Sequence, residues 1–177
     1  MTVAYHGVPG AFSHEACRAF LPGEEPISCS SFASVIKAVE EGEADLGVLP
    51  VENNNAGAVD EVRQLLAASP LEVLARHRLP IRIHLMGLPG ARLDDVRAAV
   101  SHPMALKQCA ATLASLGLAS EDAPSTSVAA RDLSDPTKAA LASEGAAEAY
   151  GLVILKRDVH DREVNETTFV VVSRVRE

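Results

Sequence analysis

Residues 42–57 read Gly-Glu-Ala-Asp-Leu-Gly-Val-Leu-Pro-Val-Glu-Asn-Asn-Asn-Ala-Gly. The apolar run from Leu46 to Val51 follows a helix-type pattern, which is typical of a buried parallel strand. Open α/β sheets hold ligands at the C-terminal ends of such strands, and here that end carries Glu52 and three asparagines. These side chains predict a loop that binds a small polar molecule. The alternative is an Asn-rich turn whose side chains bond only their own backbone.

Strands and helices alternate along the rest of the chain. Short apolar and β-branched runs predict strands at residues 2–5, 46–51, on both sides of Pro80 within 71–88, and at 98–100, 122–127, 138–141, 153–155 and 169–175. Apolar residues at helical spacing predict helices around 16–20 and over 32–39, 59–68, 105–116, 128–133 and 143–150, the last closed by Gly151. This alternation predicts an α/β fold.

The 177 residues are enough for one ordinary domain or two small lobes. No low-complexity linker divides the chain, so two lobes would be joined where the chain crosses near 78–83 and returns near 155–160. The first lobe then comprises residues 1–79 plus 156–177, and the second comprises 80–155. A cleft between lobes would collect the polar strand ends, because such grooves are favoured ligand sites.

The formal net charge is −8, and the 16 Lys and Arg are scattered. Binding of nucleic acid requires a basic patch, so the composition argues against a nucleic-acid partner. An acidic protein can bind an anion only through local donors, such as helix N-termini, backbone N–H groups or a few placed cations.

Cys17, Cys29 and Cys109 are odd in number and lack C-x-x-C spacing, so neither a disulfide framework nor a structural zinc site is expected. The N-terminus carries no basic and apolar targeting signal, and no apolar run approaches the roughly 18 residues of a membrane span. We expect a soluble, cytoplasmic protein with no membrane partner.

Polar residues gather at further places along the chain. Residues 9–15 contain Gly10, which allows close backbone approach, and Ser13, which can cap a helix whose N–H groups attract an anionic oxygen. An ordinary N-cap explains this pattern equally well. Ser101 and His102 precede a proline at a strand end, where a histidine is more often a turn residue than a base.

Residues 125–127, Ser-Thr-Ser, offer three hydroxyls that can cap a helix or hold a carboxylate. Residues 165–169, Asn-Glu-Thr-Thr-Phe, follow His160 and Asp161 just before the final strand. No nucleophile elbow, phosphate loop, dinucleotide fingerprint or metal-ligand spacing occurs. The sequence predicts a cofactor-free enzyme that works through hydroxyl and amide groups, or a binding module of the same build.

The order of these clusters resembles the catalytic domain of prephenate dehydratase. The matching pieces are Gly7-Val8-Pro9-Gly10-Ala11-Phe12-Ser13, Gly42 to Asp45 through Glu52-Asn53 and Gly57, Ser101-His102-Pro103 with Gln108-Cys109, Ser125-Thr126, Ala139 to Gly151, and Asn165-Glu166-Thr167 with Phe169. They span nearly the whole chain in the right order, which is far more specific than any one motif.

The resemblance implies two α/β lobes with mixed sheets around a central cleft, similar to the periplasmic-binding type II fold. It implies conversion of prephenate to phenylpyruvate, water and carbon dioxide in phenylalanine biosynthesis, with no cofactor or metal, by a homodimer or higher homo-oligomer. Prephenate is a dianion, so its two carboxylates need fixed donors and its ring hydroxyl needs a proton donor before it can leave.

By the same resemblance, Thr167 acts on the departing hydroxyl. A free threonine is a poor acid, so we expect it to act within a hydrogen-bond network. The residues expected to bind the substrate are Gly10, Ala11, Phe12, Ser13, Asn53, Asn54, Ser101, His102, Ser125, Thr126, Asn165 and Phe169.

The chain departs from the family pattern beside the catalytic threonine. That pattern is usually Asn-x-Thr-Arg-Phe, whereas Thr168 stands here at the arginine position. Losing a charge-assisted contact can lower a rate by orders of magnitude. Arg76, Arg82, Lys107 and Arg162 are the cations we consider as compensation.

Two other departures concern the amide loop and the end of the chain. Asn54 stands where a serine is usual, which is a milder polar change. The chain stops at Glu177, where many family members continue into a regulatory ACT domain that binds phenylalanine. We therefore expect no feedback control by that route within this chain: the enzyme is unregulated, a partner controls it, or the sequence is truncated after Arg176-Glu177.

Three alternatives remain beside the prephenate dehydratase. An arogenate dehydratase shares the chemistry and differs in its substrate, because it recognises an amino acid side chain instead of a keto acid. A non-catalytic module that binds or senses a small anion is motivated by the missing arginine. A metal-dependent hydrolase is disfavoured because the six His residues are scattered.

Overall fold

The computed structural model describes residues 1–175. The chain divides into two compact units. Of the described residues, unit 1 comprises Met1–Val8, Phe12–Pro80 and 166–175, and unit 2 comprises Pro9–Ala11 and Ile81–Asn165. Residues 9–11 and 156–165, which we expected in the first lobe, therefore group with unit 2, and Pro80, which we expected in the second, groups with unit 1.

Backbone hydrogen bonds explain why residues 156–165 belong to unit 2. The N–H of Val159 donates to the carbonyl of Ile83 at 2.9 Å, and the N–H of Ile81 donates to the carbonyl of Asn165 at 2.7 Å. Each bond joins the segment to residues 81–83, where the longer stretch of unit 2 begins, so the segment stays with unit 2 as far as Asn165.

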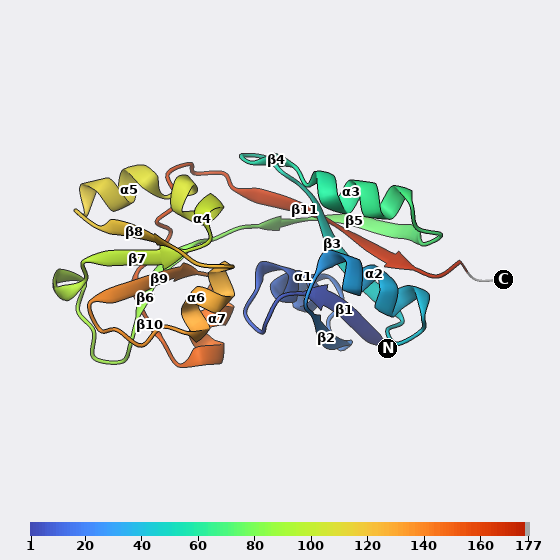
Figure 1. The fold of residues 1–177 in the computed structure, drawn as a ribbon, viewed down its shortest axis with the longest axis horizontal. Coiled ribbons are helices and arrows are strands. Elements are labelled where there is room, and N and C mark those ends of the chain that lie inside the picture. Colours follow the sequence, from blue (N-terminus) through green and yellow to red (C-terminus); the bar gives the residue numbers. More distant parts are fainter. Residues whose placement is uncertain (176–177) are drawn as a thin grey trace. The chain divides into compact units, whose positions relative to one another are not determined.

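Unit 1 is an α/β unit (Figure 1). Its strands are β1 (Thr2–His6), β2 (Glu25–Cys29), β3 (Leu46–Asn53), β4 (Gly57–Ala58), β5 (Glu72–Pro80) and β11 (Glu166–Ser173), and its helices are α1 (Phe12–Phe20), α2 (Phe32–Glu40) and α3 (Asp60–Ala67). Within the described residues these strands form one mixed sheet in the order β2-β1-β3-β11-β5, with β4 paired to β3. β1 is parallel to β2 and β3, whereas β11 is antiparallel to β3 and β5.

The two faces of this sheet are covered by different helices. Val35 of α2 and Val62 of α3 are fully buried in one cluster with Val170 of β11. Side chains alternate along a strand, so Phe169 points to the opposite face, where its ring centroid lies 6.3 Å from that of Phe20 in α1. Burial of such a valine stabilises the fold by about 1.5–3 kcal/mol.

Unit 2 is a second α/β unit with its own mixed sheet (Figure 1). Its strands are β6 (His84–Gly87), β7 (Ala98–Ser101), β8 (Ala119–Asp122), β9 (Lys138–Ala142) and β10 (Val153–Lys156), and its helices are α4 (Pro103–Gln108), α5 (Ala110–Ser115), α6 (Thr126–Arg131) and α7 (Glu144–Tyr150), with a 3-10 turn η1 (Leu93–Asp95). The strand order is β10-β6-β9-β7-β8. β7 is parallel to β8 and β9, and β6 is antiparallel to β9 and β10.

Small side chains fill much of the unit 2 core. Ala129 of α6, Ala140 of β9 and Ala146 of α7 are buried together with Met86 of β6. Because alanine carries only a methyl group, these helices can approach the sheet closely, and the flexible Met86 shares the remaining space with partly buried residues such as Leu133 and Ile154.

The α/β fold and the mixed sheets agree with the sequence-based prediction, and three local predictions do not. The helix expected over 105–116 is two helices, α4 and α5, separated at Cys109 (φ −113°, ψ 7°). Asp161 explains this break, because its N–H donates to the carbonyl of Gln108 at 2.7 Å. Its carboxylate instead accepts the N–H of Thr112, which an unbroken helix would have bonded to Gln108.

The strand predicted at 122–127 is wrong. β8 ends at Asp122, and Ser125 is the N-cap of α6, with its Oγ accepting the N–H of Val128 at 3.0 Å. Serine favours helix caps because its hydroxyl satisfies an otherwise unpaired N–H. β2 was not predicted at all, since Glu25–Cys29 has neither an apolar run nor clear alternation.

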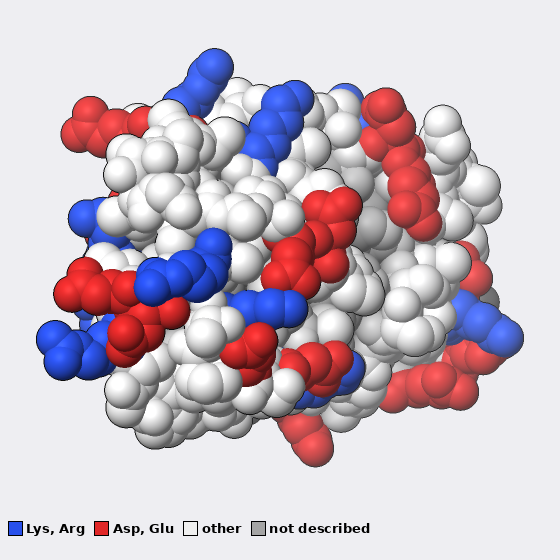
Figure 2. Space-filling view, turned by 60° about the vertical axis from the view of Figure 1, so that its left-hand side comes forward, with Lys and Arg blue, Asp and Glu red and all other residues white. Residues whose placement is uncertain are grey.

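Charged side chains are dispersed over the surface. On the face shown in Figure 2, acidic and basic side chains are interspersed and the basic ones form no continuous patch. Among residues 1–175, no helix is long and apolar enough to cross a membrane.

Candidate functional site

The amide loop after β3 meets the start of β11. In this antiparallel pair Asn53 lies directly opposite Thr167. The Nδ2 of Asn53 donates to the Thr167 Oγ at 2.9 Å, and both side chains are half-buried. The predicted catalytic threonine and a predicted binding asparagine are therefore neighbours in unit 1.

The orientation of the Asn53 amide is fixed by its own backbone. Its Oδ1 accepts the N–H groups of Asn55 and Ala56, both at 2.9 Å. An acceptor with two donors must be the oxygen, so the nitrogen faces Thr167. The Thr167 oxygen is thus an acceptor in this pair, and its hydroxyl hydrogen finds no acceptor among the described residues. That hydrogen can be donated to a ligand.

Asn54 joins the same loop to β11. Its Oδ1 accepts the N–H of Glu166 at 2.7 Å, and its N–H donates to the Glu166 carbonyl at 3.0 Å. These two bonds hold the residue before Thr167. The sequence left two interpretations of this stretch, a ligand-binding loop and a turn that bonds its own backbone. Asn53 fits part of each, since its oxygen closes a local turn and its nitrogen contacts Thr167.

Position 168 lies on the other face of the sheet from Thr167, because neighbouring residues of a strand point to opposite faces. Thr168 is paired with Glu52 on β3 and with Arg78 on β5. Within residues 1–175, the exposed guanidinium of Arg78 forms no hydrogen bond or ion pair. The cation nearest in register to Thr168 is thus Arg78, which is not among the four predicted from the sequence.

Arg82, one of the cations considered as compensation, is already paired. Its guanidinium forms a bidentate ion pair with the Asp158 carboxylate: Nε donates to Oδ1 at 2.9 Å and Nη2 donates to Oδ2 at 2.8 Å. This contact, helped by the charges of His84 and His160, lowers the pKa of Asp158 to about 2 despite some desolvation. Asp158 also adopts a left-handed conformation with φ 51°.

Three helices of unit 2 begin where its strands end. β7, β8 and β9 are parallel, so their C-terminal ends lie at one edge of the sheet. The N-caps of α4, α6 and α7 are His102, Ser125 and Ser143, and each side chain accepts a backbone N–H of its helix. The predicted residues His102 and Ser125 therefore lie at the same edge, both as helix caps.

Two further predicted residues lie at this edge. Ser101 is fully buried, and its hydroxyl donates to the carbonyl of Leu141 at 2.7 Å. It therefore joins β7 to β9 and presents no exposed atom to a ligand. Thr126, the first residue of α6, is half-buried.

Gly10 rests directly against α7. Its carbonyl accepts the Ser143 hydroxyl at 2.6 Å, while the same Ser143 Oγ accepts the N–H of Ala146 at 3.0 Å. The carbonyl of Pro9 accepts the hydroxyl of Tyr150 at 2.6 Å. Both contacts fix the backbone of residues 9–11 in unit 2.

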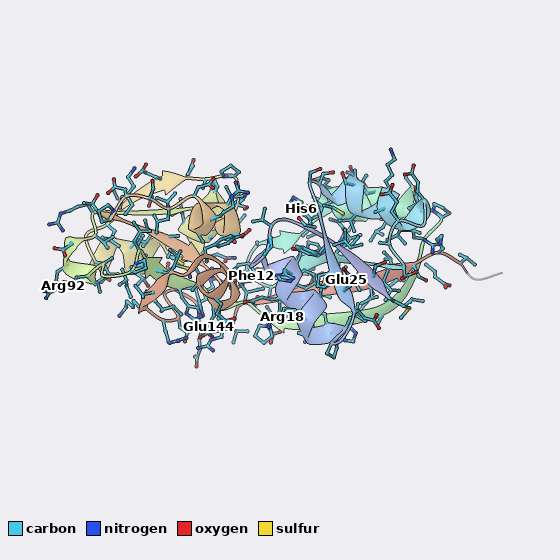
Figure 3. All side chains as sticks on the ribbon, turned by 90° about the horizontal axis from the view of Figure 1, so that it is seen from below. His6, Phe12, Arg18, Glu25, Arg92 and Glu144 are labelled. Carbon is cyan, nitrogen blue, oxygen red and sulfur yellow. The ribbon has the colours of Figure 1, made fainter. Side chains whose placement is uncertain are left out.

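The other predicted residues of this segment surround the start of α1. Ala11 is buried, Phe12 is half-buried and begins the helix, and Ser13 is 8% exposed in its first turn. Ser13 therefore lies inside α1 and is not its N-cap. Figure 3 shows Phe12 at the start of α1 and Glu144 at the start of α7.

Asn165 is 4% exposed, and its Nδ2 donates to the Oε1 of Gln108 at 3.1 Å. Asp161, four residues earlier, caps α5 through the N–H groups of Ala111 and Thr112. Desolvation raises the pKa of Asp161, but these hydrogen bonds outweigh it and the pKa is lowered. Asn165 therefore lies at the end of a segment that is pinned to α4 and α5.

Phe169, the last predicted binding residue, is 2% exposed and packs near Phe20. It belongs to the core beneath Thr167. The structure does not offer its ring to solvent.

The thiols do not supply a nucleophile. Burial raises the pKa values of Cys17 and Cys109 to about 12, and burial also raises the pKa of Cys29. At neutral pH these thiols stay protonated, whereas the thiolate is the reactive form. Among residues 1–175, no group of His, Cys, Asp and Glu is arranged to hold a metal ion.

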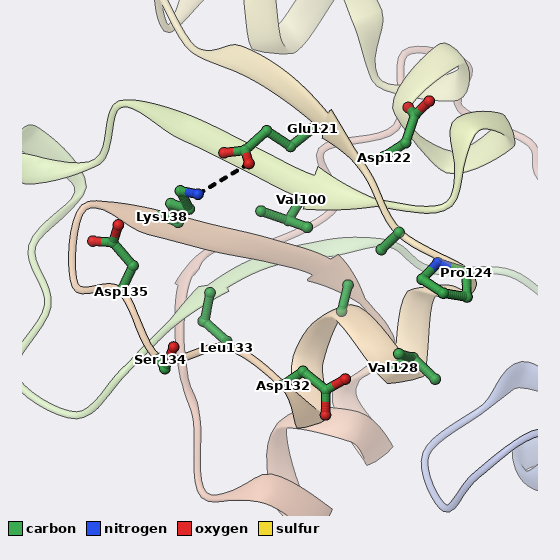
Figure 4. Close-up of a pocket in the computed structure, with 12 residues that line it drawn as sticks. Val100, Glu121, Asp122, Pro124, Val128, Asp132, Leu133, Ser134, Asp135 and Lys138 are labelled. Atoms are coloured by element: carbon green, nitrogen blue, oxygen red, sulfur yellow. Dashed lines mark hydrogen bonds and ion pairs between the residues drawn. The ribbon is translucent and has the colours of Figure 1, made fainter.

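Unit 2 also contains an acidic pocket of about 250 Å³ (Figure 4). Val100, Val128 and Leu133 form its apolar lining, and its charged residues are Glu121, Asp122, Asp132, Asp135 and Lys138. Lys138 is paired with Glu121 at 2.9 Å. An excess of carboxylates repels an anion, and none of the predicted site residues lines this pocket.

The sequence pattern of the family described as "Prephenate dehydratase" matches residues 3–177. The chain belongs to the prephenate dehydratase family. Arogenate dehydratase 1 of Petunia hybrida is 40% identical over 181 residues, covering 98% of this chain and 42% of that protein. A bifunctional N-acyl-homoserine lactone acylase/prephenate dehydratase of Komagataeibacter europaeus is 37% identical, covering 97% and 62%. The chain thus spans less than two thirds of these relatives.

Solved structures give the same family. A prephenate dehydratase from Arthrobacter aurescens in complex with L-Phe superposes with a TM-score of 0.91 at 28% identity, covering all of this chain and 61% of that one. GqqA, described as a novel type of quorum quenching acylase, gives 0.93 at 36% identity, with 100% and 65% covered. A putative methionine-binding lipoprotein of Bacillus subtilis, 12% identical with a TM-score of 0.52, covering 98% of this chain and 83% of that one, shares the fold.

Within this prephenate dehydratase domain, sequence reasoning missed two residues that hold predicted site segments. Ser143 binds the Gly10 carbonyl, and its signal was its place directly before an Ala-rich helix. Arg63 of α3 binds Glu52 and the Val51 carbonyl. No sequence pattern points to Arg63, because its partners belong to another element.

Proposed function

We propose that this domain dehydrates and decarboxylates prephenate to phenylpyruvate, as a step of phenylalanine biosynthesis. Family membership supports a dehydratase, and the hydrogen bond from Asn53 to the Thr167 oxygen is the observation that carries the proposal. Because Asn53 donates to that oxygen, the hydroxyl hydrogen is not used in this pair and can be donated to a substrate.

The reaction consumes one proton, and electrons move from the carboxylate through the ring towards the departing hydroxyl. The bond from the ring to its carboxylate breaks and carbon dioxide leaves, while its electron pair enters the ring. The ring C–O bond breaks as the hydroxyl takes up a proton and departs as water. One proton is consumed for each prephenate dianion, so Thr167 donates to the leaving oxygen and regains its proton from solvent.

The Asn53 hydrogen bond makes this step easier. A donor on the Thr167 oxygen stabilises negative charge that develops there as its proton moves towards the leaving group. Because the backbone already holds the Asn53 oxygen, the donor is oriented before the substrate binds. The substrate carboxylates then require further donors beside this pair.

The test compares variants in a phenylpyruvate assay with prephenate as substrate. Thr167→Val keeps the β-branched shape and removes the hydroxyl, so we expect kcat to fall by about 100- to 1000-fold. Thr167→Ser keeps the hydroxyl and retains most of the activity. Thr168→Val is the matched control, since it removes a neighbouring half-buried hydroxyl from the opposite face. Equal rates for Thr167→Val and wild type would contradict the assignment.

Arogenate is the second candidate substrate, because the Petunia hybrida relative is named an arogenate dehydratase. Arogenate carries an amino group where prephenate carries a keto group, and the ring chemistry is unchanged. Comparing kcat/KM for both compounds with the same protein decides between them, and a higher value for arogenate would replace our proposal.

An acylase is a third candidate, motivated by the likeness to GqqA. Hydrolysis of an N-acyl-homoserine lactone would release homoserine lactone and a fatty acid, which mass spectrometry detects. Release of these products without turnover of prephenate or arogenate would favour the acylase. Binding of prephenate, seen as a raised melting temperature without product, would favour a small-anion sensor.

A further inference from the structure

A β-bulge lies directly before the amide loop. Thr168 is opposite Glu52, yet Phe169 is opposite Pro50, so Val51 is an extra residue on β3. Bulges near active sites redirect the side chains that follow them. Here the side chain that follows Val51 and Glu52 is that of Asn53, the partner of Thr167.

The carbonyl of the bulged residue is bonded outside the β11 ladder. The Val51 carbonyl accepts the N–H of Val59 at 2.9 Å and the Nε–H of Arg63 at 3.2 Å. Arg63 also donates from Nη2 to the Glu52 carboxylate at 2.9 Å. One guanidinium thus holds two consecutive residues of β3 from α3.

We propose that Arg63 is a positioning residue for the Asn53–Thr167 pair; the catalytic part of this inference rests on the proposed function. Arg63 fixes the bulge, the bulge directs Asn53, and Asn53 orients the Thr167 hydroxyl. The planar guanidinium suits this task because its N–H groups point in fixed directions. One donates to the Val51 carbonyl and another donates to the Glu52 carboxylate.

Position 168 shows why this contact matters in this chain. Thr168 is the β11 neighbour of Glu52 and has no charge to offer that carboxylate. Arg63 is the cation paired with Glu52 in the described residues. The charge that braces this part of β3 therefore comes from α3 and not from β11.

The first experiment measures kcat and KM for Arg63→Met, which removes both contacts and keeps a long, helix-favouring side chain. A misplacement of about 1 Å in a catalytic group can cost about 100-fold in rate, so we expect kcat to fall 10- to 100-fold with KM nearly unchanged. Arg63→Lys keeps one donor and should fall between Arg63→Met and wild type.

Arg157→Met is the matched control. Arg157 and Glu144 form an equally exposed Arg–Glu pair at 3.0 Å in unit 2, so its loss removes a comparable surface ion pair without touching the bulge. We expect its kcat to equal that of wild type. A kcat for Arg63→Met within two-fold of this control, or a raised KM at constant kcat, would overturn the inference.

A second readout does not depend on turnover. The side-chain amide of Asn53 gives a pair of NMR signals, assigned by their loss in Asn53→Asp. We expect these signals to shift or broaden in Arg63→Met and to stay unchanged in Arg157→Met. Unchanged Asn53 signals in Arg63→Met would overturn the inference. If wild-type protein turns over neither prephenate nor arogenate, the proposed function fails, and this NMR comparison alone decides the role of Arg63.

Discussion

Gly10 permits a close contact that a single methyl group would destroy. The residue has φ 88°, which L-residues with a Cβ rarely adopt. A Cβ built there would lie 2.5 Å from the Cα and 2.9 Å from the backbone nitrogen of Ala146. Since the clash involves helix backbone, no side-chain rotation can relieve it.

The expected cost of Gly10→Ala has two parts. The left-handed conformation costs an alanine about 1–2 kcal/mol. Overlap in a packed region adds about 1–3 kcal/mol. If residues 9–11 instead move away from α7, the hydrogen bonds of Ser143 and Tyr150 are lost, at about 1 kcal/mol each. The total is about 2–5 kcal/mol by either route.

Gly23 provides the control that separates the two parts. It has nearly the same φ, 92°, and a Cβ there would meet nothing within 4 Å. Gly23→Ala should therefore cost about 1–2 kcal/mol, from the backbone conformation alone. Urea unfolding of both variants gives the comparison. Equal losses for Gly10→Ala and Gly23→Ala would refute the steric argument, because only Gly10 contacts a helix.

Other contacts give separate tests. Thr168→Arg places a guanidinium opposite both Arg78 of β5 and Glu52 of β3, so we expect Arg78→Thr to raise the stability of the Thr168→Arg variant by about 0.2–1 kcal/mol more than it raises that of wild type in urea unfolding; an equal effect in both backgrounds would contradict this register. Arg82→Met should lower the stability in urea unfolding at neutral pH, and this difference should disappear as the pH falls from 4 to 2, because the lowered pKa of Asp158, about 2 in place of 3.8, favours folding only while its carboxyl is charged. Cys109, with its pKa raised to about 12 by burial, should resist iodoacetamide at pH 8 when peptide masses are compared with those of the unfolded chain, and rapid alkylation of the folded protein would show that the site opens.

The candidate site illustrates how far residue types alone can lead. The sequence singled out the amide loop and Thr167, and the structure places Asn53 and Thr167 in one hydrogen bond. It also assigned Ser101 and Phe169 to a binding surface, whereas both are buried in their own units. A polar or aromatic residue at a strand end has the same pattern whether it faces a ligand or the core.

Local signals were sufficient for most secondary structure. Ser143 before the helix and Gly151 after it mark both ends of α7, because each satisfies backbone groups within one turn of itself. The break at Cys109 had no such signal. It depends on Asp161, about fifty residues later, which takes over hydrogen bonds that the local sequence would have given to one continuous helix.

The sequence by itself determined the family, the alternation of strands and helices, and the residue types available for chemistry, because these depend on neighbours along the chain. Only the tertiary structure decided the pairing of Asn53 with Thr167, which are 114 positions apart, and the bulge at Val51 that Arg63 holds. Strand register and long-range hydrogen bonds join residues whose local patterns carry no information about each other, so their partners become defined only when the sheet forms.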